Sequence, residues 1–215
     1  MTSAPAPDLE IDDAPPLGRR HSRKFLFLIM GISAIACIIA SAVLSIESYH
    51  LALNRSTQLG CNFNEVINCG AVAVSKQATF FGFPNAFIGL ATEPVVLTIA
   101  VAGFCGVRFP RWFMFSAQIG YLFGLIFAYW LFYQSFFNIG ALCPWCLTIT
   151  LFTTITFFTM LHINIMEKNL YLPAGAQRAA EKFIRLDLDV FIPAIILLTL
   201  LAGIIIKYGP TLIAG

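Results

Sequence analysis

The stretch NIGALCPWCLTIT, residues 138–150, places two thiols three residues apart inside a run, Trp112 to Met166, that contains no Asp, Glu, Lys or Arg. Asn, Gly and Pro cluster at the start of this stretch, which is typical of a turn. A run of that length is far too long for one helix across a hydrocarbon core of about 30 Å, so we expect it to fold back on itself here. The two thiols therefore stand where a turn meets a membrane helix.

The composition of the whole chain indicates a membrane protein. Of its 215 residues, 59% are hydrophobic, 11% are charged and 21 are Phe. A soluble domain usually carries about a quarter charged residues, so most of this surface is expected to face lipid. The sequence predicts an all-α integral membrane fold in a lipid bilayer, and nothing in it indicates a nucleic-acid partner.

Uncharged runs predict five membrane spans, of which the first is the clearest. It covers 22 residues, Phe25 to Ile46. That length suffices for one crossing and exceeds the apolar region of a signal peptide, about 7–15 residues, so we interpret it as an uncleaved anchor. One acid, Glu93, interrupts the second span. The predicted spans cover residues 25–46, 86–107, 112–137, 143–166 and 190–206.

Basic residues predict the orientation of these spans. Ten of the thirteen Lys and Arg residues flank the spans on one side, which assigns that side and the N-terminus to the cytoplasm of a plasma membrane. The C-terminus, loop 47–85 and the turn at 138–144 are then extracytoplasmic. Residues 1–24 are predicted to form a disordered cytoplasmic tail, because their proline-rich and acidic start has too little apolar content to pack. Residues 25–215 form the predicted transmembrane domain.

The six cysteines fall into two classes by location. Cys37 and Cys105 lie within predicted spans, where a buried thiol behaves as a small hydrophobe, and we interpret them as packing residues. The other four lie on the predicted extracytoplasmic side, where disulfides form and persist. They are Cys61, Cys69, Cys143 and Cys146.

The CPWC motif is predicted to open the fourth span. Pro144 suits the first helical position, which makes Cys143 the N-cap and places Cys146 one turn into the helix. The two sulfurs then share a helix face, and the free N–H groups of the helix end stabilise a thiolate. We expect Cys143 to face water and Cys146, about 4.5 Å deeper, to face lipid. A pair so placed is suited to take electrons from a water-side thiol and pass them to a lipid-dissolved quinone.

Other interpretations of these cysteines stay open on spacing alone. CXXC also occurs as half of a zinc site or as a structural bridge, but zinc needs further ligands, and His50 is the single His predicted on this side. We therefore predict no metal. Cys61 and Cys69 are spaced more widely, which fits a structural bridge. With a second pair on the same face of the membrane, a relay by thiol–disulfide exchange from a mobile loop becomes the better interpretation.

The order of these features resembles the vitamin K epoxide reductase family, in its bacterial form without a fused thioredoxin-like domain. The resemblance rests on CNFNEVINC at 61–69, Ser75, FFGFPNAFIGL at 80–90 and CPWC at 143–146. It implies a four-helix bundle around a quinone, a peripheral fifth helix, and a short half-helix after the loop cysteines, here residues 70–82.

The resemblance also implies roles for the cysteines and one amide. Cys61 and Cys69 would be the shuttle pair that accepts electrons from a partner. Cys69 would form a mixed disulfide with Cys143, which frees Cys146 to reduce the quinone. Asn85 would donate a hydrogen bond to a quinone oxygen. Its position after a proline at a helix start supports this independently, although a plain helix cap is the alternative.

The remaining candidates for quinone contact are weaker. The resemblance places Ser75 near the junction of loop and bundle. Thr150 stands where animal members carry a tyrosine, so one hydrogen bond to the quinone would be weaker or absent. Phe83 and Phe87 are possible lining residues from a group that also includes Phe80 and Phe81, although core packing is the default for Phe. Glu93 is either a proton donor to the quinone or a structurally paired acid.

Together these features predict a quinone-dependent thiol oxidase that supports disulfide-bond formation outside the cytoplasm. The acceptor would be menaquinone or ubiquinone. The electron donor would be a separate DsbA-like thiol oxidase, recognised by loop 47–80, because this chain ends at Gly215 without a thioredoxin-like domain. A DsbB-type enzyme is disfavoured, because there CXXC precedes the looser pair. A non-catalytic membrane protein with two static disulfides is the alternative.

Overall fold

The computed structural model describes residues 22–54 and 59–214. Over these ranges the chain is helical and contains no strand, only two isolated β-bridges. Five helices are long and apolar enough to cross a membrane. These are α1 (Arg23–Leu53), α3 (Ala86–Phe104), α4 (Arg111–Tyr133, continued by the π-helix η3, Gln134–Ile139), α5 (Pro144–Met166) and α7 (Leu188–Ala214). Three short elements connect them, namely α2 (Cys69–Ala73), η2 (Lys76–Thr79) and α6 (Ala174–Arg185).

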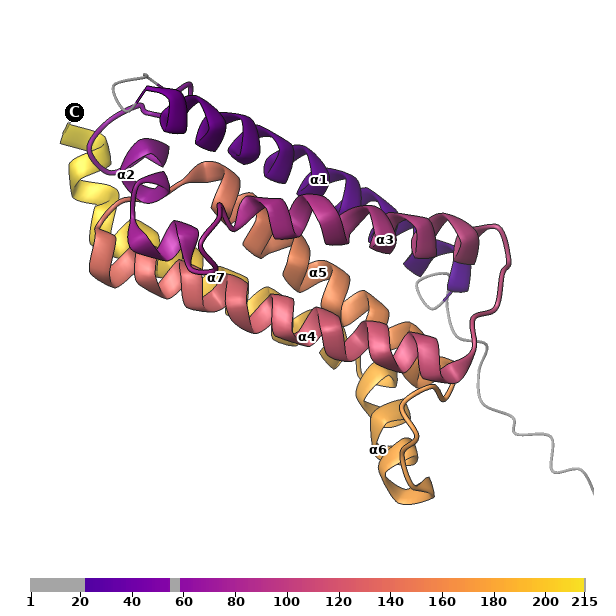
Figure 1. The fold of residues 1–215 in the computed structure, drawn as a ribbon. Helices are drawn as coiled ribbons and strands as arrows, with labels where there is room; N and C mark the ends of the chain where they lie inside the picture. Colours follow the sequence, from indigo (N-terminus) through magenta and orange to yellow (C-terminus); the bar gives the residue numbers. More distant parts are fainter. Residues whose placement is uncertain (1–21, 55–58, 215) are drawn as a thin grey trace, which may run out of the picture.

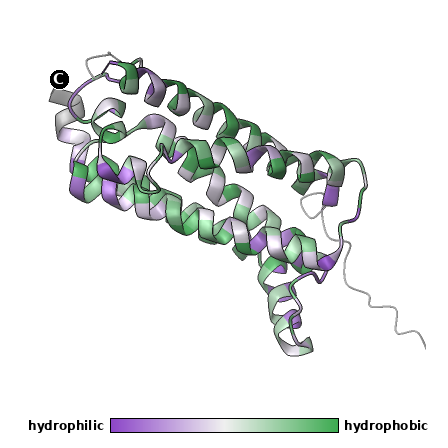
Figure 2. Ribbon diagram, in the orientation of Figure 1, coloured by the Kyte–Doolittle hydropathy of each residue, from purple (hydrophilic) through white to green (hydrophobic). Residues whose placement is uncertain are grey.

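The predicted all-α fold with five membrane spans is confirmed, and the chain is a multi-pass membrane protein. Figure 2 shows hydrophobic residues along the long helices. The ends of the spans differ from the prediction. The first helix continues past Ile46 to Leu53, and the last runs from Leu188 to Ala214. A charge marks where a helix leaves the hydrocarbon core, but it does not end the helix.

The four helices α1, α3, α4 and α5 form a bundle, and α7 packs against α5 outside it (Figure 1). Within the bundle α1 packs against both α3 and α5, and α4 packs against α5. The buried side chains of His162 and Asp189, 2.7 Å apart, connect α5 to α7. We call the end of the bundle that carries Cys61, Cys69, Cys143 and Cys146 the thiol end; the C-terminus lies there too.

We call the opposite end of the bundle, around Arg23 and Glu167, the closed end. All four bundle helices contribute buried side chains to one apolar core there, including Phe27, Met114 and Met160. The approach of α1 to α3 is close, because a Cβ on Gly103 would lie 2.4 Å from the ring of Phe27. Only glycine therefore fits at this contact without a shift of the ring.

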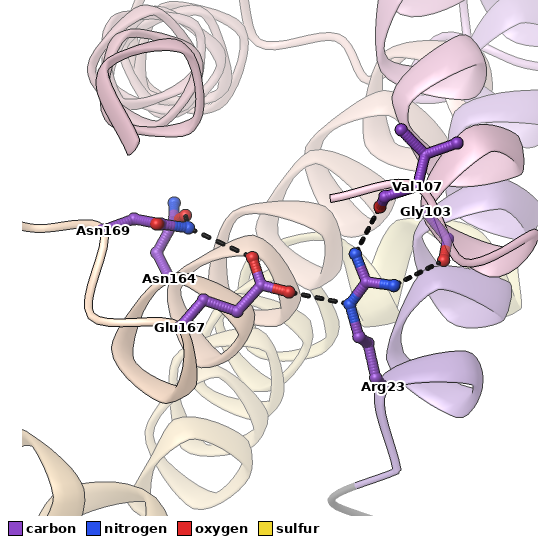
Figure 3. A network of polar contacts seen from close by, with 6 residues as sticks. All are labelled: Arg23, Gly103, Val107, Asn164, Glu167 and Asn169. Carbon is purple, nitrogen blue, oxygen red and sulfur yellow. Dashed lines mark hydrogen bonds and ion pairs between the residues drawn. The ribbon is translucent and has the colours of Figure 1, made fainter. Parts of the chain in front are cut away.

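A polar network covers the core at the closed end (Figure 3). Arg23 on α1 donates to Glu167 Oε1 at the end of α5 (2.7 Å) and to the carbonyls of Gly103 and Val107 after α3. Asn169 joins the network by donating to Glu167 Oε2 and to Asn164 Oδ1. Arg23 thus brings a charged donor to backbone carbonyls at the end of α3.

Several connecting segments differ from the sequence-based expectation. The half-helix predicted over 70–82 is two short pieces: α2 ends at Ala73, and Ser75 caps the start of η2 by accepting from the Ala78 N–H. The amphipathic helix α6 was not predicted; its charged residues led us to treat it as a plain connection. The predicted tail at 1–24 lies mostly outside the described residues, but Arg23 and Lys24 belong to α1.

Candidate thiol relay site

A small hairpin brings the loop cysteines together. Asn62 and Asn68 pair across it in an antiparallel bridge, and Asn64 Oδ1 accepts from the backbone N–H groups of Val66 and Ile67. Asn68 then caps α2 by accepting from the Ala71 N–H. The asparagines of CNFNEVINC therefore fold the segment back on itself. Its two ends meet in a disulfide between Cys61 and Cys69.

A second bridge fastens this hairpin to the residue before CXXC. Ile67 pairs with Leu142 in a parallel bridge: the Asn68 N–H donates to the Leu142 carbonyl (3.0 Å), and the Leu142 N–H donates to the Val66 carbonyl (2.7 Å). The loop expected to be mobile is thus held at the start of α5. Because Cys69 follows Asn68 and Cys143 follows Leu142, the bridge places the loop cysteines beside the cysteines of CPWC.

The start of α5 agrees with the prediction from the CPWC motif. Cys143 is the N-cap, with extended backbone, and its Sγ accepts from the Cys146 N–H at 3.4 Å. Pro144 occupies the first helical position, as expected. The preceding turn is made by Gly140, whose φ of +76° lies in the left-handed region that favours glycine. Local sequence therefore determines how both thiols are presented.

Cys143 is not exposed to water, contrary to the prediction. Its side chain is 1% exposed and packs in one buried cluster with Cys61, Cys69, Leu51 and Leu59. The hairpin and the end of α1 cover it. This cover was missed because it depends on a contact between segments about 75 residues apart in the chain, which spacing within CPWC does not reveal.

The electrostatics of Cys143 favour its thiolate. A hydrogen bond from the Cys146 thiol lowers the pKa of Cys143, and the backbone N–H groups of Cys146 and Trp145 act in the same direction, although burial opposes them. The thiolate is the nucleophile in disulfide exchange. Cys143 is therefore the member of the inner pair that is best prepared to attack, or to leave from, Cys69.

The end of α7 supports this arrangement from outside the bundle. Tyr208 is buried against Val66 and Leu142, two of the residues that form the parallel bridge. Its hydroxyl donates to the Phe136 carbonyl at 2.9 Å, and the Lys207 ammonium donates to the same oxygen. Phe136 lies in η3, where the π-helical turn changes the backbone pairing. The fifth helix thus holds the turn that leads into CXXC.

A cavity of about 610 Å³ opens beneath the thiols and runs between α3 and α4. Cys69, Cys143 and Cys146 line it at the thiol end, and its walls are mostly apolar, with a few polar groups. Apolar walls with a few convergent polar groups are typical of small-molecule sites. The cavity joins both redox pairs to a space suited to a flat, largely apolar ligand.

Asn85 lines this cavity and does not act as a plain helix cap. It stands at the start of α3, but its side chain makes no capping hydrogen bond. Instead its Nδ2 donates to the Gln77 carbonyl at 2.7 Å, and its Oδ1 is buried without a partner. Because an amide NH₂ has two donors, one N–H of Asn85 stays available to a ligand. Ser75 also lines the cavity, while its hydroxyl donates to the Val72 carbonyl.

Of the other predicted contacts, one lines the cavity and two do not. Thr150 is in the wall, but its hydroxyl donates to the Cys146 carbonyl (3.0 Å), so its proton is already used. Phe83 and Phe87 are 44% and 41% exposed and are not part of this lining, so their contact with a quinone stays a prediction. Phe81 lines the cavity instead, held by Phe127 of α4 at a ring distance of 5.4 Å.

Glu93 reaches the inner part of the same cavity. Its side chain is 6% exposed; Oε1 accepts from the Tyr121 hydroxyl at 3.0 Å, and Oε2 is buried without a partner. The structural pairing weighed for Glu93 is therefore present, with Tyr121 as the partner that the sequence did not reveal. The unpartnered oxygen leaves its role as a proton donor a prediction.

Glu47 is a site residue that sequence reasoning missed. It ended the first uncharged run and was treated as a membrane boundary, yet it lies in α1 with both carboxylate oxygens 3.4 Å from Cys61 Sγ. Glu47, Cys61 and Cys69 lie close enough together to hold a metal ion. However, the two sulfurs are bonded to each other, so they are not thiolate ligands in this state. Cys37 is buried and Cys105 is exposed at the end of α3, and neither lies in the cavity lining.

Comparison with known proteins identifies one family. The vitamin K epoxide reductase family matches residues 28–161, which include both cysteine pairs and α3 to most of α5. No curated protein and no solved structure matched the chain.

Proposed function

Because this chain belongs to the vitamin K epoxide reductase family, a family of membrane thiol–disulfide oxidoreductases that act with quinones, we propose that it is a quinone-dependent thiol oxidase. One observation carries the proposal: Cys69 and Cys143 share a buried cluster at the mouth of a cavity that Cys146 also lines. Both pairs are thus within one site, and the inner pair borders a space for the acceptor.

The outer half of the relay accepts electrons from a dithiol partner. A partner thiolate attacks the Cys61–Cys69 disulfide, and one sulfur of the pair leaves with the electron pair. The partner's second thiolate then attacks the mixed disulfide, so the partner is oxidised and both Cys61 and Cys69 are reduced. Phe63 is 72% exposed on the hairpin, which offers an apolar contact for such a partner.

The inner half begins with Cys143 and Cys146 joined as a disulfide. Cys69 attacks Cys143, a Cys69–Cys143 bond forms, and Cys146 leaves as a thiolate. Cys61 then attacks Cys69, which restores the shuttle disulfide and releases Cys143. The product of these steps is the arrangement that the structure contains, with Cys61 bonded to Cys69 and both residues of CXXC as thiols.

A bound quinone supplies the electron sink, taking two electrons and two protons as the inner pair returns to a disulfide. The residues of this chain bind and orient it. The apolar walls of the cavity would exclude water, Phe81 would offer a ring face, and the second N–H of Asn85 would donate to a quinone oxygen. The hydroxyl of Thr150 is already used as a donor, so Asn85 carries more of this polar contact.

We assign the thiol end to the extracytoplasmic side of the membrane, with a separate DsbA-like protein as electron donor. Basic residues support this orientation. Those at the start of α1, after α3 and α5, and along α6 lie at the closed end, and an excess of Lys and Arg is typical of the cytoplasmic side. Oxidising conditions outside the cytoplasm are also those in which the Cys61–Cys69 bond persists.

The test is quinone reduction by the purified protein in lipid vesicles. Vesicles that contain menaquinone or ubiquinone are mixed with a reduced DsbA-like protein, and quinone loss is followed by absorbance. We expect wild-type protein to reduce at least one quinone and Cys143→Ala to fall to the rate of protein-free vesicles. Cys105→Ala serves as the matched control and should stay within about twofold of wild type, since a change outside the site costs little.

The alternative of two static disulfides predicts a different result. In that case wild-type protein would reduce neither quinone, and the Cys61–Cys69 bond would stay oxidised in the presence of the reduced partner. Trapping free thiols with a maleimide before and after mixing distinguishes the two accounts.

A further inference from the structure

Glu47 places a carboxylate against the shuttle disulfide. It lies on α1, seven residues after Ala40 and about two turns before the helix ends at Leu53. The side chain of Glu47 is half-buried. Both of its oxygens lie 3.4 Å from Cys61 Sγ, and Cys61 itself is 4% exposed. A carboxylate at a membrane boundary is usually solvated, whereas this one is turned toward a buried sulfur.

The chemical nature of this contact depends on the redox state of Cys61. In the disulfide the sulfur has no hydrogen, so it gives the carboxylate no hydrogen bond. In residues 22–54 and 59–214 no other side chain or backbone group donates to the carboxylate of Glu47 at hydrogen-bond distance. Reduction of Cys61 to a thiol would supply the missing donor at the position where the oxygens already lie. The site is therefore arranged for the reduced thiol.

We propose that Glu47 is the catalytic base that removes the proton from the Cys61 thiol when the shuttle disulfide is re-formed. The inference rests on the proposed function, because it concerns one step of the relay. That step requires a thiolate, and Cys61 is buried away from water, which would otherwise accept its proton. The carboxylate of Glu47 is the acceptor within reach.

The step starts from the Cys69–Cys143 mixed disulfide, with Cys61 as a thiol and Glu47 as a carboxylate. Glu47 takes the proton of Cys61 as the Cys61 sulfur attacks the Cys69 sulfur. The Cys61–Cys69 bond forms, the Cys69–Cys143 bond breaks, and Cys143 leaves as a thiolate with the electron pair. Glu47 is left as a carboxylic acid and releases its proton to water through its exposed side.

The charges around Glu47 fit this direction of transfer. Hydrogen bonds lower the pKa of the Cys143 thiol, and the negative charge of Glu47 opposes them. Neutralising Glu47 by the proton of Cys61 removes that opposition at the moment when Cys143 leaves as a thiolate. Tyr49 and His50, both exposed, are the other titratable groups on this part of α1.

The experiment compares Glu47→Gln with Glu65→Gln. Glu65 is an exposed acid in the same loop, so its change to Gln alters the charge of this region by the same amount without contact to the sulfur. Each variant is reconstituted in vesicles that contain the quinone active with wild type, and turnover with a reduced DsbA-like protein is measured. Samples quenched in acid are blocked with maleimide and digested, and mass spectrometry quantifies the peptides joined through Cys69 and Cys143.

We expect Glu47→Gln to slow turnover by about 10²-fold at neutral pH, the usual contribution of a general base, and to accumulate the Cys69–Cys143 species. The defect should shrink as pH rises, because hydroxide then removes the proton of Cys61. Glu47→Asp keeps a carboxylate and should recover part of the rate. Glu65→Gln should match wild type.

Equal turnover of Glu47→Gln and Glu65→Gln, with no accumulated mixed disulfide, would overturn the role of Glu47 and leave the oxidase function standing. A rate loss in Glu47→Gln that neither high pH nor Glu47→Asp recovers would also overturn it, since that is the behaviour of a structural residue. Failure of the oxidase function is distinguishable, because wild-type protein itself would then reduce no quinone.

Discussion

The two ends of the helix bundle use the same helices in opposite ways. At the closed end, side chains from α1, α3, α4 and α5 fill one core, and Arg23 ties three helix ends together above it (Figure 3). From the thiol end, where Cys69 of the hairpin lines it, a cavity of about 610 Å³ runs between α3 and α4 as far as Val96 and Met160 of that core. The polar contacts of the closed end involve side chains of fixed charge, whereas those of the thiol end involve groups that change during the reaction.

This difference indicates that stability and chemistry are separated along the bundle axis. Close packing and charge-assisted hydrogen bonds at the closed end hold the helices together, so the thiol end tolerates a cavity. Changes at the closed end should therefore lower stability without altering turnover. Changes at the thiol end should alter turnover with little loss of stability.

The larger effect on stability is expected from Arg23→Gln. The change removes the ion pair with Glu167 and the hydrogen bonds to Gly103 and Val107. Because both partners of the ion pair are partly exposed, we expect a loss of about 2 kcal/mol in the free energy of unfolding. Thermal unfolding in detergent measures it, and quinone reduction per folded molecule should be unchanged. The matched control is Lys24→Gln, an exposed neighbour. An equal loss in both variants would contradict the role of the network.

A smaller effect is expected from Tyr208→Phe at the thiol end. The hydroxyl that donates to the Phe136 carbonyl is lost, but Lys207 still donates to that oxygen, so stability should fall by less than about 1 kcal/mol. Turnover should slow by up to a few-fold, because this contact holds the turn before Cys143. Tyr133→Phe, an exposed tyrosine near the end of α4, should change neither quantity. A stability loss in Tyr208→Phe as large as that of Arg23→Gln, with normal turnover, would contradict the separation of stability and chemistry between the two ends.

Much of the fold was predictable because hydropathy and cap chemistry are local. The uncharged runs predicted the five spans, and Pro144 predicted the N-cap at Cys143. Helix ends were less predictable, because Glu47 marks the membrane boundary while the helix continues to Leu53. The helix α6 was missed because its charged residues hid the apolar face of its sequence, AGAQRAAEKFIR.

The part of the site that could not be predicted depends on contacts distant in sequence. The pairing of Ile67 with Leu142 helps to bury Cys143, and the sequence around either residue does not predict this pairing. Likewise Phe81 packs on Phe127 and lines the cavity, whereas Phe83 does not line it, and the local sequence does not distinguish the two. The contact of Glu47 with Cys61 also joins residues distant in sequence, so it could not be predicted either.

The central claim is that electrons pass between the two pairs through a bond from Cys69 to Cys143. The most direct test is the variant Cys61→Ser with Cys146→Ser, which removes the natural partner of each and leaves Cys69 and Cys143 as the thiols of this end. After mild oxidation in membranes, mass spectrometry should find the peptides of Cys69 and Cys143 joined by a disulfide in most molecules. If these two cysteines stay as free thiols, or pair with Cys37 or Cys105, the relay does not exist as described.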